Sequence, residues 1–141
     1  EPVMKPLMTG WLRKCAMKYV CLISADTWME RFDPADAAAH FEEYREFTDS
    51  IRASGHLVGA NRLQPPQTAV TVRVRQGRVT TTDGPYAETK EQVGGNYIVE
   101  ARDLNEAIQI AARIPGARYG CVEIRPVADD PDTRRTLGDP I

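Results

Sequence analysis

The sequence predicts an α+β domain built on an antiparallel sheet. Val70, Val72 and Val74 alternate with polar residues, which is the pattern of a strand with one solvated face. Two other segments carry apolar residues at helical spacing directly after the N-cap residues Asp33 and Asp103. In chain order the segments give a ferredoxin-like βαβββαβ succession with an inserted β-hairpin.

The individual elements follow from turn and cap signals. Asp33-Pro34 places an N-cap before a proline at the first helical position, and Gly55 ends that helix. Gln76-Gly77 marks a turn between two extended runs, and Asp103 with Glu106 forms a capping box. The expected strands are 19–23, 57–63, 70–75, 78–82, 97–101 and 121–127, and the expected helices are 34–54 and 104–114.

Each helix is expected to turn one apolar stripe toward the sheet. The stripe of the first helix comprises Ala37, Phe41, Tyr44, Phe47 and Ile51. That of the second comprises Leu104, Ile108 and Ala111. Two helices cannot cover both faces of such a sheet, so a homodimer is the physical expectation.

The composition fits one soluble domain. With 141 residues, 42% of them hydrophobic, the chain can bury a core without disulfides or metals. A net charge of −2 gives no general attraction to nucleic acid or anionic membrane, and no segment reaches the roughly 20 apolar residues of a membrane span. The three cysteines lack metal-ligand spacing, so we expect reduced thiols in a cytoplasmic protein, buried where Cys21 and Cys121 lie in strands.

The chain is expected to divide into three parts. Residues 1–16 form an N-terminal extension, either from an upstream start or as an arm that docks on a partner subunit through Trp11, because Met17 starts a strand directly. Residues 17–128 form the domain. Residues 129–141 are a polar C-terminal tail, expected to be mobile.

The segment from Asp83 to Gln92, followed by Gly94-Gly95, is the most distinctive stretch. Asp83 can accept hydrogen bonds from backbone N–H groups downstream, Gly84 permits a positive φ, and Pro85 fixes φ. Connections of this length in a compact domain are often functional. The segment is therefore a candidate site.

This segment also carries a family resemblance. Together with Ala111 to Pro115, Arg118 to Gly120 and Arg125 to Val127, it resembles the YCII-related proteins, and within them the DGPF-type branch, over residues 17–127. The resemblance implies a dimeric α+β barrel in which two ferredoxin-like units place their sheets face to face. A relative in the wider superfamily is a dehydrochlorinase, and a His–Asp pair has been proposed as the active site of the smaller members. DGPF-type genes often accompany alternative sigma factors, which suggests a regulatory setting.

Two departures from the family pattern are visible. Tyr86 replaces the usual phenylalanine of the motif, and residues 115–118 offer no carboxylate where the acidic partner is expected. The family histidine of the first helix falls near Tyr44, and His40 lies one turn earlier on the same face. The His–Asp pair therefore does not transfer directly.

Asp83 and His40 are the candidate catalytic residues. Asp83 could act as a general base or could be an Asx-turn cap of the loop. His40 could move a proton near neutral pH, with Tyr44 beside it, or could be a structural histidine near the start of the helix. Candidate binding residues are Tyr44, Tyr86, Thr89, Lys90 and Arg118.

Several of these binding residues have plain structural alternatives. Lys90 could bind an anion with Thr89 or could pair with a neighbouring glutamate. Tyr86 could pack the loop against the core, and Arg118 could bridge subunits. No metal site and no cofactor are expected, since two distant histidines and three scattered cysteines give no ligand set.

Two functions remain open on the sequence alone. One is a cofactor-free enzyme acting by proton transfer or elimination on a small organic molecule, with a cleft between sheet and helices. The other is a non-catalytic dimeric module that binds a ligand or a protein, for example in transcription regulation. Neither function involves nucleic-acid or membrane binding by this domain.

Overall fold

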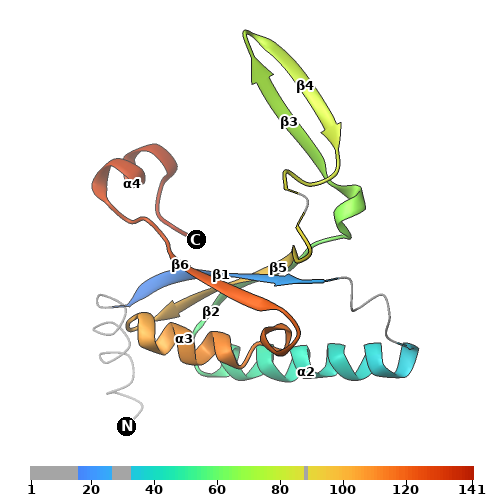
Figure 1. Cartoon of the computed structure of the whole chain (residues 1–141). Helices are drawn as coiled ribbons and strands as arrows, with labels where there is room; N and C mark the ends of the chain where they lie inside the picture. Colours follow the sequence, from blue (N-terminus) through green and yellow to red (C-terminus); the bar gives the residue numbers. More distant parts are fainter. Residues whose placement is uncertain (1–15, 27–32, 88) are drawn as a thin grey trace.

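The computed structural model describes residues 16–26, 33–87 and 89–141 (Figure 1). Most of the predicted N-terminal extension lies outside these residues. The described helices and strands are β1 (Met17–Ala25), α2 (Pro34–Ala53), β2 (Leu57–Arg62), η2 (Pro66–Thr68), β3 (Val70–Arg75), β4 (Arg78–Asp83), β5 (Gln92–Ala101), α3 (Leu104–Ala112), η3 (Pro115–Arg118), β6 (Cys121–Pro126) and α4 (Pro131–Leu137).

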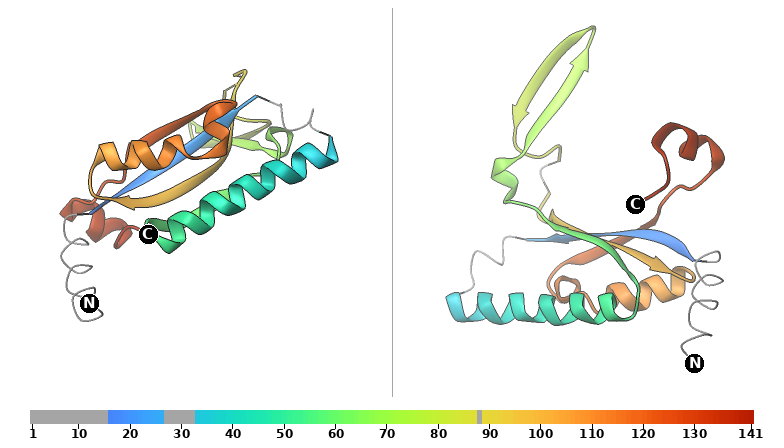
Figure 2. Two further views of the ribbon diagram at one scale, coloured as in Figure 1. Left: turned by 90° about the horizontal axis from the view of Figure 1, so that it is seen from below. Right: turned by 180° about the vertical axis from the view of Figure 1, so that it is seen from behind.

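The strands form two antiparallel sheets. The main sheet has the order β2-β5-β1-β6, and β3 pairs with β4 in a separate hairpin. Helices α2 and α3 lie against one face of the main sheet, while the hairpin and α4 rise from the opposite side (Figures 1 and 2). We call that opposite face the open face. The predicted α+β class with an antiparallel sheet is confirmed.

The core lies between the main sheet and the two helices that cover it. Tyr19 and Cys21 of β1 point into it, as do Val99 of β5 and Ile51 of α2. Burial raises the pKa of the Cys21 thiol to about 11, so this thiol stays protonated, as expected of a buried cysteine. Cys121, in contrast, is exposed, because its side chain lies on the open face of an edge strand.

The inward stripe of α2 differs from the prediction at its N-terminal end. His40 is buried there, whereas Phe41 is 44% exposed and lies under the guanidinium of Arg62, 4.9 Å from its carbon to the ring centroid. The stripe therefore runs through His40, Tyr44, Phe47 and Ile51. The N-cap prediction is confirmed, since an Asp33 carboxylate oxygen accepts from the backbone N–H of Asp36 at 2.8 Å.

Helix α3 is capped as predicted but turns a different face inward. Asp103 accepts from the Glu106 N–H at 2.9 Å. The predicted Ala111 is buried, but Leu104 and Ile108 are half exposed, because the rest of the buried stripe consists of Ala107, Ile110 and Ile114. The helix ends at Ala112, and the chain turns into η3, which fixes Ile114 rather than Leu104 against the core.

The β3–β4 hairpin stands away from the rest of the molecule (Figure 1). Gln76 and Gly77 have φ of 52° and 74°, which suits the tight turns that match the twist of a hairpin. The distinctive segment after it is shorter than predicted, because β5 already begins at Gln92. The connection is thus limited to residues 84–91.

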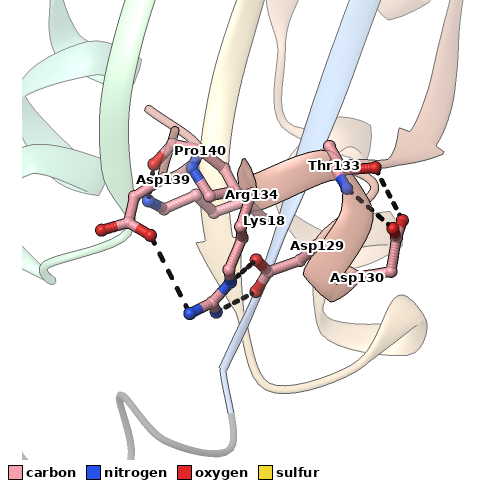
Figure 3. A network of polar contacts seen from close by, with 7 residues as sticks. All are labelled: Lys18, Asp129, Asp130, Thr133, Arg134, Asp139 and Pro140. Carbon is pink, nitrogen blue, oxygen red and sulfur yellow. Dashed lines mark hydrogen bonds and ion pairs between the residues drawn. The ribbon is translucent and has the colours of Figure 1, made fainter. Parts of the chain in front are cut away.

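The C-terminal segment contains a helix that the sequence analysis did not predict. The Asp130 carboxylate caps α4 by accepting from the Thr133 N–H at 2.9 Å, and Asp129 pairs with Arg134. The segment is held to β1 by Lys18, whose Nζ donates to the Pro140 carbonyl at 2.6 Å (Figure 3). The segment thus has a defined place on the open side of the sheet.

Candidate functional site

His40 lies at the centre of an aromatic cluster beneath the sheet. Its side chain is only 4% exposed and packs edge-on against two tyrosine rings. The ring centroid of Tyr44, one turn later on α2, is 4.9 Å away, and that of Tyr119, just after η3, is 5.7 Å away. The predicted proximity of His40 and Tyr44 is therefore present in the structure.

A hydrogen bond from η3 fixes Tyr44. Its hydroxyl oxygen accepts from the backbone N–H of Gly116 at 3.0 Å. Burial raises the pKa of Tyr44 to about 12, so the phenol stays protonated at neutral pH. A Cβ at position 116 would lie 2.5 Å from the Tyr44 hydroxyl and 2.8 Å from Cγ2 of Ile23, so the backbone can approach this closely only at a glycine.

An ion pair forms the rim of the cluster. Arg118 of η3 pairs with Glu43 of α2, and its guanidinium carbon lies 5.4 Å from the Tyr119 ring centroid. A shallow groove starts at this pair and runs between α2 and the segment that follows α3. Its lining residues are Glu43, Glu46, Phe47, Ser50, Arg113, Pro115 and Arg118.

The cluster favours a neutral imidazole. Burial lowers the pKa of His40, the Arg118 guanidinium lowers it further, and the Glu43 carboxylate acts against both. A neutral histidine at pH 7 is a proton acceptor, which is the state that a general base needs. His40, Tyr44 and Arg118 are thus brought together, as a base beside a cation.

Asp83 is not brought to this cluster. It ends β4 at the base of the hairpin, on the opposite side of the sheet from α2 (Figures 1 and 2). Among the described residues its carboxylate accepts no hydrogen bond, so the expected Asx-turn cap is not seen there. The loop is shaped instead by Gly84, whose φ is 102°, whose N–H donates to Ala69 and whose carbonyl accepts from the Thr71 hydroxyl.

The remaining predicted binding residues lie on the same exposed connection. Tyr86 is 82% exposed and packs under Arg73 of the hairpin instead of against the core. Gln92 holds the connection together, because its Nε2 donates to the carbonyls of Ala87 and Thr89 and to the Thr89 hydroxyl at 2.9–3.0 Å. Lys90 is exposed beside them.

Comparison with known proteins assigns the chain to a protein family. The YCII-related domain matches residues 17–130. The chain belongs to the YCII-related family. An uncharacterised protein of Rhizobium meliloti (strain 1021) is 39% identical over 77 residues, a stretch that covers 53% of this chain and 62% of that protein. The chain therefore matches less than two thirds of its curated relative's length.

Sequence analysis of this YCII-related protein missed several residues that build the site. Tyr119 and Glu43 complete the His40 cluster, and the close approach of Gly116 allows the Tyr44 hydrogen bond. The spacing of 40, 43 and 44 on one helix could have indicated a shared face. The contact with Tyr119 joins residues far apart in sequence, so no local pattern could have revealed it.

The described residues form neither a metal-binding cluster nor a membrane-spanning helix. Within residues 16–26, 33–87 and 89–141, no three His, Cys, Asp or Glu side chains gather as a set that could hold a metal ion. In the same part of the chain, no helix has the length and apolar character needed to cross a membrane.

We expect the stability of the protein to fall on acidification because of His40. Its folded-state pKa is lowered from the usual value near 6.5. Below that pH the unfolded chain binds a proton that the folded state resists, so stability declines as the pH falls from 6.5 through the folded pKa. The slope from this one group is at most about 1.4 kcal/mol per pH unit. Chemical denaturation of wild type and His40→Gln between pH 5 and 8, at one protein concentration, measures it.

The difference in the free energy of unfolding between wild type and His40→Gln isolates the contribution of the histidine. We expect it to be flat above pH 7 and to change below 6.5. A difference that is flat throughout, or an imidazole NMR titration with the pKa of His40 at or above 6.5, would contradict a buried neutral histidine.

Proposed function

We propose that this protein is a homodimer of ferredoxin-like subunits forming an α+β barrel, of the DGPF-type branch, in the cytoplasm. The sheet order β2-β5-β1-β6 with two helices on one face supports the ferredoxin-like assignment. The open face presents the half-buried apolar residues Val20, Leu22 and Ile98, which alternate with core residues such as Tyr19 and Val99. A second sheet packed on this face would remove them from water.

We further propose that the His40 cluster carries out cofactor-free proton transfer on a small organic acid or phenol. The single observation that supports this is a buried, neutral imidazole held between two tyrosine rings beside Arg118. The Arg118–Glu43 pair is exposed, so it contributes little to stability and an anionic ligand can compete for the guanidinium. The imidazole behind it would then accept the substrate proton.

One observation favours the second function, a non-catalytic dimeric ligand-binding module. His40 is 4% exposed, and Tyr119, which is half exposed, covers it. A substrate reaches the imidazole only if the Tyr119 ring turns aside. If it does not, the groove binds a ligand without chemistry.

Ligand binding is expected to depend on Arg118. A thermal-shift screen of the purified protein against small organic acids and phenols should find ligands that raise its melting temperature, because they bind only the folded state. Arg118→Gln should abolish the shift. Arg52→Gln is the matched control, since Arg52 pairs with Asp49 on the exposed side of α2, outside the groove and away from the open face. Equal loss in both variants, or no ligand at all, would rule out the groove as the site.

Proton transfer is measured separately, by deuterium uptake from D₂O into a bound ligand with an acidic C–H. We expect His40→Gln to lose this exchange while retaining the thermal shift. Asp83→Asn tests the earlier prediction that Asp83 is the base, and it should leave the exchange unchanged if His40 is the base. Exchange lost only in Asp83→Asn would instead assign the chemistry to the hairpin connection. Binding without exchange in wild type would favour the non-catalytic module.

A further inference from the structure

The β3–β4 hairpin carries an apolar stripe exposed to solvent. Cross-strand partners share a face, so Val74 lies beside Val79, and Val72 and Val70 continue the same face toward the base. These four side chains are 55–68% exposed, because the hairpin stands clear of the core (Figure 1). We call them the valine stripe.

Two features show that the hairpin is incomplete alone. A two-stranded hairpin without a third strand or a packed helix is marginally stable in water. In addition, Arg75 and Arg78 lie directly opposite each other next to the turn, and like charges at such positions are destabilising. An apolar partner with acidic groups would relieve both problems.

The C-terminal segment has the complementary character. It contains four aspartates and two arginines from Asp129 to Pro140, against three arginines and one aspartate in the hairpin. It also exposes Leu137 and Ile141, which are 79% and 83% accessible. Its position is fixed by the contacts of Lys18 and Arg134 drawn in Figure 3.

Both surfaces project from the open side of the sheet but from opposite ends of it (Figures 1 and 2). The hairpin cannot fold back onto the C-terminal segment of its own chain without leaving this position. A second copy packed on the open face can be related by a two-fold axis in either of two ways. One places hairpin beside hairpin and aspartates beside aspartates, whereas the other places each hairpin beside the partner's C-terminal segment.

We propose that the valine stripe of each subunit packs on the C-terminal segment of a second copy of this chain. Charge complementarity selects this arrangement, because the alternative brings like charges together. The valines then meet Leu137 and Ile141, and Arg75 and Arg78 meet the aspartates. The inference rests on the proposed dimer. It adds that each β3–β4 hairpin packs on the other subunit, and we call the hairpin in this position the exchanged arm. It is independent of any ligand at His40.

The first test is the dimer dissociation constant, measured by sedimentation over a dilution series. Val72→Thr/Val74→Thr/Val79→Thr keeps β-branched side chains in the strands but makes the stripe polar, and should weaken the dimer roughly tenfold or more. Ile108→Thr, which changes a half-exposed residue on α3 away from the open face, is the control and should leave the constant unchanged.

The second test identifies the surface of the partner subunit on which the valine stripe packs. Arg75→Asp/Arg78→Asp should weaken the dimer, and adding Asp132→Lys/Asp139→Lys in the same chain should restore it, because the exchanged charges again oppose each other. In a hairpin-to-hairpin arrangement no such rescue occurs, and that result would overturn the proposal.

Hydrogen exchange of the wild type covers the case in which a hairpin variant fails to fold. Amides of residues 70–83 should be protected at concentrations where the dimer forms and should exchange freely on dilution. A dimer whose hairpin amides exchange freely at all concentrations overturns the exchanged arm but leaves the sheet-to-sheet dimer intact. A wild type that is monomeric throughout overturns both.

Discussion

Gly120→Ala is expected to destabilise the protein by roughly 3 kcal/mol or more, although it adds one methyl group. A Cβ at this position would lie 2.0 Å from the Ser24 carbonyl oxygen and 2.9 Å from Cα of Ala25. Both atoms belong to the backbone of β1, which is paired with β6 directly after Gly120. The clash can therefore be relieved only by separating two paired strands.

Gly94→Ala is the matched control. Gly94 lies in β5 of the main sheet, and a Cβ there meets nothing within 4 Å. We expect it to change the free energy of unfolding by less than about 0.5 kcal/mol. Urea denaturation and thermal melting measure both variants, and Gly120→Ala should melt roughly 10 °C lower or more. Similar stabilities for the two variants would show that the turn before β6 can relax.

Local signals predicted most of the fold. The N-caps at Asp33 and Asp103 and the turn at Gln76-Gly77 act within a few residues, and each appears in the structure where the sequence indicated it. The buried faces of the helices were predicted less well. Whether His40 or Phe41 turns inward depends on where the sheet lies. Helical periodicity alone places both residues near the edge of the apolar stripe of α2.

For the candidate site too, contacts between residues close in sequence were predicted, and contacts that depend on tertiary structure were not. His40 and Tyr44 are neighbours on one helix, so their contact followed from helical geometry. The pairing of Asp83 with His40 required knowledge of which side of the sheet the hairpin leaves, and this is a tertiary property. Tyr119 and Gly116 come to the cluster through the turn of η3, which no periodic pattern encodes.

Gly116→Ala is the second large effect that we expect, roughly 2–3 kcal/mol, and it links stability to the site. The new methyl group would displace the Tyr44 hydroxyl, and the Tyr44 ring packs edge-on against His40. Tyr44→Phe should cost roughly 1–3 kcal/mol by a different route, because it leaves the buried Gly116 N–H without its acceptor.

The double variant decides whether these two effects share one contact. Removing the hydroxyl frees part of the space that the methyl group needs, so Tyr44→Phe/Gly116→Ala should be less destabilised than the two single changes added together, by roughly 0.5–2 kcal/mol. The residual cost comes from Ile23, whose Cγ2 would still lie 2.8 Å from the methyl group. Urea denaturation of the four proteins completes the cycle. Strict additivity would mean that the methyl group is accommodated without disturbing the Tyr44 hydroxyl, so the two changes would not share one contact.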